Sequence, residues 1–66
     1  MLDQDKEMLK QILANYTAVE VVSDLVSLFR NHRDNLSDLG LKDQAKDYAE
    51  AASLLSRVRD VMLDAE

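Results

Sequence analysis

The chain has 66 residues, one glycine, one histidine, neither cysteine nor proline, and a net charge of −5. This length allows a single small domain, residues 1–66, with a marginal core. The lack of cysteine excludes disulfides and thiolate metal sites, and one histidine excludes a classical zinc site, so we expect no metal and no cofactor. Small domains gain stability from disulfides, metals or oligomerisation. Because the first two are excluded here, we expect oligomerisation.

Charge and hydropathy also exclude two kinds of partner. Non-specific binding to DNA, RNA or anionic membranes needs a basic surface, which this acidic chain lacks. No stretch approaches the ~20 apolar residues that span a bilayer, and the charged residues 1–10 do not resemble a signal peptide. We therefore expect a cytoplasmic protein that binds neither nucleic acid polymers nor membranes.

The near absence of helix-breaking residues predicts an all-α fold. The first helix is expected at about residues 3–14, where Leu9, Ile12 and Leu13 form a short apolar stripe. A helix of this length is marginal by itself in water, so it must pack against another element.

A longer second helix is predicted at about residues 18–39. Thr17 and Glu20 have the spacing of a capping box and mark its start. A run of valines near this point favours a strand locally, but the apolar residues continue at helical spacing, which favours helix. Seam positions at spacings of three and four are Val22, Leu25, Phe29, His32, Leu36 and Leu39.

Gly40 follows this helix and is the expected C′ residue, with Leu41 returning to contact Leu36. A third helix is predicted at about residues 42–64. Its seam positions are Leu41, Ala45, Tyr48, Ala52, Leu55, Arg59 and Met62. Because the turn is short, the two long helices should pack antiparallel as a hairpin.

Each long helix has more apolar surface than one neighbour can cover. Soluble monomers avoid large exposed apolar patches, so we expect a homodimer or larger helical bundle. The first helix is expected either to pack on its own hairpin or to be exchanged with a second copy. The predicted oligomer interface comprises Val22, Leu25, Val26, Phe29, Leu54, Leu55, Val58 and Val61.

Few residues suggest chemistry, and no nucleophile, phosphate-loop or dinucleotide motif is present, so we do not expect an enzyme. His32 is expected to be partly buried at the hairpin interface and bonded to the backbone or to Tyr48, with a pH-sensitive or ligand contact as the alternative. Arginine side chains bind phosphate and carboxylate in pairs of hydrogen bonds. The candidate ligand-binding residues are Arg30, His32, Arg33, Tyr48, Arg57 and Arg59.

The same arginines have a simpler interpretation as salt-bridge partners on the helix surfaces. Arg59 would then pair with Asp24 or Glu20, and Arg33 with Asp47. Because the hairpin is antiparallel, Arg33 and Arg59 should lie at different heights along it, and only a second copy would bring them together.

Two functions follow from these patterns. The leading hypothesis is a small non-enzymatic regulatory protein, a homo-oligomeric helical hairpin that contacts another protein through a helix face or groove. The alternative is a sponge that holds a small anionic, nucleotide-like ligand between protomers, at the arginine-rich positions. In general shape, such an assembly resembles the small helical proteins with which phages sequester nucleotide signals, although no sequence motif is shared.

Overall fold

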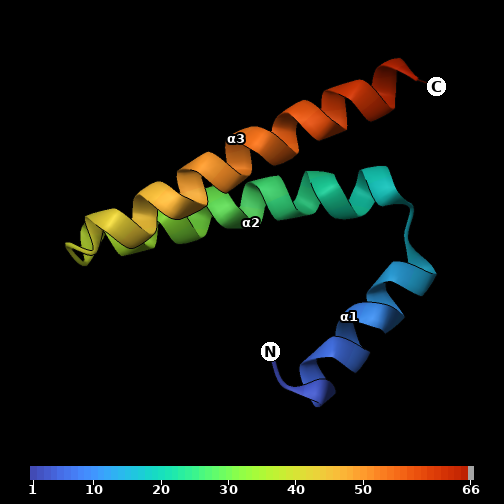
Figure 1. The fold of residues 1–66 in the computed structure, drawn as a ribbon, viewed down its shortest axis with the longest axis horizontal. Helices are drawn as coiled ribbons and strands as arrows, with labels where there is room; N and C mark the ends of the chain where they lie inside the picture. The colour runs from blue at the N-terminus through green and yellow to red at the C-terminus, as the bar shows by residue number, and fades with distance from the viewer. Residues whose placement is uncertain (66) are drawn as a thin grey trace.

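The computed structural model describes residues 1–65, which form three helices. They are α1 (Asp3–Asn15), α2 (Ala18–Asp38) and α3 (Lys42–Asp64). The observed ends of α1 and α2 lie within one residue of the predicted ends at 14 and 39. The all-α prediction is confirmed, and α2 and α3 pack side by side as the predicted antiparallel hairpin (Figure 1).

The start of α2 is held by the predicted capping box. Thr17 Oγ1 accepts the backbone N–H of Glu20 at 3.2 Å, and Glu20 Oε1 accepts the backbone N–H of Thr17 at 3.4 Å. Two otherwise unpaired donors at the helix start are thereby satisfied. This local signal therefore determines where α2 begins.

The turn between α2 and α3 is the predicted Schellman closure. Leu41 donates its N–H to the carbonyl of Leu36 at 2.9 Å, and Gly40 donates to the carbonyl of Ser37 at 3.0 Å. Gly40 has φ +80°, a conformation that strains residues with a side chain. The single glycine of the chain is therefore used where its backbone freedom is required.

The hairpin core is small, and it agrees with the predicted seam at Leu36, Ala45 and Ala52 but differs from it on the rest of α2. The buried residues are Val26, Leu36, Ala45 and Ala52. Val26 is 1% exposed, whereas the predicted seam residue Leu39 is 74% exposed and His32 is exposed. The apolar arc of α2 is wide enough to contain several parallel stripes, and its spacing alone does not select the one that faces α3.

Outside the α2–α3 hairpin, the chain is extended and little of it is buried. Every residue from 1 to 18 is exposed, and α1 contacts only α2, from which it turns away in Figure 1. The radius of gyration is 13.5 Å, whereas a compact chain of this length has about 11 Å. Of the two arrangements expected for the first helix, packing on its own hairpin is therefore not observed.

Candidate binding surfaces

The two sides of the α2–α3 hairpin differ in chemistry. On one side, the ring of Tyr48 from α3 packs edge to face against Phe29 and His32 of α2, at centroid distances of 5.3 and 4.6 Å. On the other side, residues including Arg33 and Lys42 line a groove. Because successive helical residues are rotated by about 100°, the neighbouring side chains can be assigned to these sides.

From the side that carries the rings, apolar residues continue around α3 to its outer surface, and we call this region the apolar face. Its α3 portion is largely exposed: Leu54 is 60%, Val58 47% and Val61 68% exposed. Leu28 of α2 is also exposed, and Leu25 and Leu55 are half-buried. The apolar face consists of Leu25, Leu28, Leu54, Leu55, Val58 and Val61. Contiguous apolar surface of this kind is typical of interaction sites.

The structure divides the predicted oligomer interface into two groups. Val26 is buried between α2 and α3 of its own chain, so it is not accessible to a second copy. Val22 and Phe29 are half-buried beside it. The remaining five predicted residues belong to the apolar face, so this part of the interface stays a prediction with accessible side chains.

His32 differs from its predicted environment. It is exposed rather than partly buried, and its contact with Tyr48 is ring packing in place of the predicted hydrogen bond. The reason is the rotation of α2, which places Val26 at the centre of the seam and moves His32 toward its edge. His32 and Tyr48 nevertheless lie together, as the sequence suggested.

The arginines do not make the predicted salt bridges. Arg33 pairs with its neighbour Asp34 (Nη2 to Oδ1, 2.9 Å), and not with Asp47. Arg59 pairs with Asp60 (Nε to Oδ1, 3.7 Å) and not with either predicted acid of α2. Such partly exposed pairs on a helix surface contribute little to stability.

The six candidate ligand-binding residues do not form one site in a single chain. Arg30 and Arg57 are exposed on different helices, and the guanidinium of Arg59 also donates to Ser56 Oγ at 3.2 Å. Arg33 lies near the turn, whereas Arg59 lies toward the opposite end of the hairpin. His32 and Tyr48 pack ring against ring, but the arginines are spread over both ends of the hairpin, so a site that uses all six residues requires a second copy.

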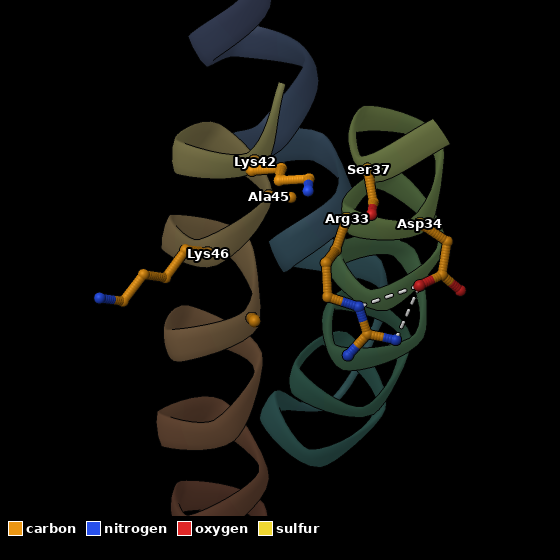
Figure 2. A pocket seen from close by; sticks show the side chains of 7 residues that line it. Arg33, Asp34, Ser37, Lys42, Ala45 and Lys46 are labelled. Atoms are coloured by element: carbon orange, nitrogen blue, oxygen red, sulfur yellow. Dashed lines mark hydrogen bonds and ion pairs between the residues drawn. The ribbon is translucent and has the colours of Figure 1, made fainter. Parts of the chain in front are cut away.

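A basic groove near the turn was missed from the sequence. It has a volume of about 240 Å³ and is lined by Arg33, Asp34, Ser37, Lys42, Ala45, Lys46 and Ala49. In Figure 2, Lys42 extends toward Ser37 across the groove, whereas Lys46 points away from it. Lys42 and Lys46 are one helical turn apart, which was the available signal, but their proximity to Arg33 depends on how the hairpin packs.

Comparison with protein-family models, with curated proteins and with solved structures finds no match for this chain. Within residues 1–65, no group of three or more histidine, aspartate or glutamate side chains is placed to hold a metal ion. None of the helices in this range is long and apolar enough to cross a membrane. Function is therefore inferred from the two faces of the hairpin.

Proposed function

We propose that this protein is a small cytoplasmic, non-enzymatic regulator that assembles as a homo-oligomer of helical hairpins and binds another protein. The observation that carries this proposal is the apolar face, where Leu54, Val58 and Val61 remain exposed on α3. Water disfavours such a surface by roughly 25 cal/mol for each Å². Covering it with a second copy supplies the core that the isolated hairpin lacks.

The amount of exposed surface supports assembly. The chain exposes 5332 Å², whereas a compact monomer of this mass exposes about 4,200 Å². The surplus is about 1,100 Å² for each chain, or roughly 2,200 Å² for two copies, which exceeds the ~1,600 Å² of a standard stable interface. Two chains thus have enough surplus surface for a stable dimer.

The polar groups support binding rather than catalysis. Every buried residue among residues 1–65 is apolar. Catalytic acids and bases are commonly desolvated in clefts, where their pKa values shift. Here the charged side chains lie on solvated helix faces, where they orient partners and maintain solubility.

Self-association is tested by native mass spectrometry and sedimentation velocity of wild type, Val58→Asp and Ser53→Asp. Val58→Asp places a charge on the apolar face, whereas Ser53→Asp places one on the exposed polar side of the same helix. We expect an oligomer for wild type and the Ser53 variant, and a smaller species for the Val58 variant. A wild-type monomer at high micromolar concentration would contradict the proposal.

Binding of another protein needs a separate experiment. Wild-type protein on a support captures candidates from a cell lysate, and each purified candidate is then titrated against wild type and Val58→Asp. We expect a saturable interaction with wild type. If this interaction requires the assembled oligomer, its affinity should be lower for Val58→Asp. The absence of any saturable partner would leave self-association without the proposed regulatory role.

The basic groove supports a second candidate function, the binding of a small anionic ligand. Arg33 and Lys42 face one groove with one carboxylate, Asp34, among its lining residues. Calorimetric titration with inorganic phosphate and a panel of nucleotides tests it on wild type, Lys42→Ala and Lys10→Ala, the last a control on α1. A binding heat that is present with wild type and Lys10→Ala but absent with Lys42→Ala would support ligand binding in the groove. No binding heat with wild type would exclude these ligands.

A further inference from the structure

Helix α1 has an apolar face without a neighbour. Leu9, Ile12 and Leu13, which we call the α1 stripe, are all exposed. Met1, Met8, Leu9 and Ile12 surround a hollow of about 270 Å³ together with Asp5. A 13-residue helix does not hold its conformation in water by propensity alone. The α1 stripe therefore needs an apolar surface to cover it.

A matching surface exists on α3. Leu54, Val58 and Val61 form an outer stripe that points away from the buried seam and remains exposed. With the alanines Ala51 and Ala65 at its ends, it extends over about 21 Å of helix, and α1 is about 20 Å long. The two stripes thus have similar length and the same apolar character.

The conformation of the linker between α1 and α2 holds α1 apart from the hairpin of its own chain. Tyr16 has φ −130° and ψ 154°, and Thr17 has φ −72° and ψ 159°, so both residues are extended. Thr17 is also held by the capping box with Glu20. In Figure 1 the chain turns back at this linker, but α1 diverges from α2 and makes no contact with α3, so packing against its own hairpin requires a different conformation of these residues. A second copy can receive α1 without any change in this linker.

We propose that α1 is exchanged between two copies and lies parallel to α3 of the second copy, where it covers the Leu54, Val58 and Val61 stripe. This inference rests on the proposed homo-oligomer and specifies its interface. Both chains donate α1 and both receive it, which satisfies the two-fold symmetry of a homodimer. The exchange buries part of the surplus surface of each chain.

Charge selects the parallel orientation. At 100° per residue, Lys6 and Lys10 flank one side of the α1 stripe, and Met8 flanks the other. The outer stripe has an acidic side and an apolar side. The acidic side carries Glu50, Asp60 and Asp64 together with Arg57, and the apolar side carries Leu55 and Met62.

Only parallel packing matches both sides at once. It places the lysines of α1 beside the acidic side of α3 and, in the register that aligns Leu13 with Val61, places Met8 beside Leu55. Antiparallel packing lays Lys6 and Lys10 over Leu55 and Met62. The lysines then lose their acidic neighbours, and Met8 loses its apolar neighbours. The Lys10 to Glu7 pair within α1 is exposed at 3.0 Å and holds Lys10 only weakly. Complementary charges at such a rim mainly determine orientation.

The test uses engineered cysteines, since the chain has none of its own. Leu13→Cys and Val61→Cys are made in separate chains of different mass, mixed to allow exchange and then oxidised. Parallel exchange predicts a disulfide-linked heterodimer, identified by mass spectrometry and peptide mapping. The matched control pairs Leu13→Cys with Leu54→Cys. Residues 54 and 61 are about 10 Å apart along α3, beyond the ~6 Å span of a disulfide.

The outcomes separate the exchange from the proposed function. Cross-linking of Leu13→Cys to Leu54→Cys instead of Val61→Cys would overturn the orientation. A monomer with an internal disulfide in the Leu13→Cys and Val61→Cys double variant would show that α1 packs on its own chain. An oligomer without either cross-link would overturn the exchange and leave self-association intact, whereas a wild-type monomer would overturn both.

Discussion

Phe29 and Tyr48 pack edge to face with their ring centroids 5.3 Å apart, and this pair joins the middle of α2 to the first third of α3. His32 meets the same tyrosine ring at 4.6 Å, so Tyr48 contacts two rings of the facing helix. Edge-to-face pairs contribute about 1 kcal/mol beyond the area that they bury. In a hairpin with only four buried residues, such contacts are a large share of the packing.

Replacing Tyr48 by leucine should therefore destabilise the fold. We expect Tyr48→Leu to lower the free energy of unfolding by about 1–2 kcal/mol, because both ring contacts are lost while apolar area is retained. Tyr16→Leu is the control, since Tyr16 is largely exposed. Urea denaturation followed by circular dichroism, at one fixed protein concentration, measures both. Equal effects of the two variants would contradict the assigned role of the ring pair.

The turn glycine offers a test of backbone strain without a steric clash. A Cβ at Gly40 meets no atom within 4 Å, so Gly40→Ala is penalised only by the positive φ of +80°. We expect a loss of about 1–2 kcal/mol in unfolding free energy. Gly40→Asn should lose less, because asparagine tolerates this conformation better. An alanine variant as stable as wild type would mean that the turn is not the Schellman closure.

The capping box predicts a graded effect at Thr17. Thr17→Ala removes the Oγ1 acceptor of the Glu20 N–H and should lower stability by about 1 kcal/mol. Thr17→Ser keeps the acceptor and should remain close to wild type. The same thermal or urea unfolding curves measure both variants. Because the linker that directs α1 begins at this cap, we also expect Thr17→Ala to weaken self-association.

Val26 and Val58 should respond in opposite ways to the same substitution. Val26→Asp places a charge in the seam, so we expect loss of helicity and unfolding. Val58→Asp should keep the helicity of the hairpin and lose assembly instead. Circular dichroism and sedimentation velocity on both variants separate these outcomes. Val26→Ala provides a milder control, with an expected loss of about 2 kcal/mol from the cavity.

The proposed orientation of α1 predicts a charge effect. Lys10→Glu places an acid beside the acidic side of α3 in the second copy, so we expect assembly to weaken, and to weaken more at low salt. Lys46→Glu has the same charge change at a position outside this contact and serves as the control. Dissociation constants from sedimentation at two salt concentrations measure the effect. Equal weakening by both substitutions would indicate a general charge effect rather than the proposed contact.

Several features could be predicted because their causes lie within a few residues of one another. Thr17 and Glu20 form their capping box across three positions, and Gly40 closes its turn with carbonyls of the preceding helical turn. The three helices follow from apolar spacing and the lack of proline. The exposure of Leu54, Val58 and Val61 also follows, since the apolar arc of α3 is wider than one neighbouring helix can cover.

The tertiary structure decided the remaining features, because they depend on the rotation and approach of helices whose residues are distant in sequence. It selected Val26 rather than Leu25 for the seam, and it moved His32 to the edge of the hairpin. It brought Lys42 of α3 to the same groove as Arg33 of α2. Apolar spacing identifies an amphipathic face, but only the packing against α3 determines which residues of that face are buried.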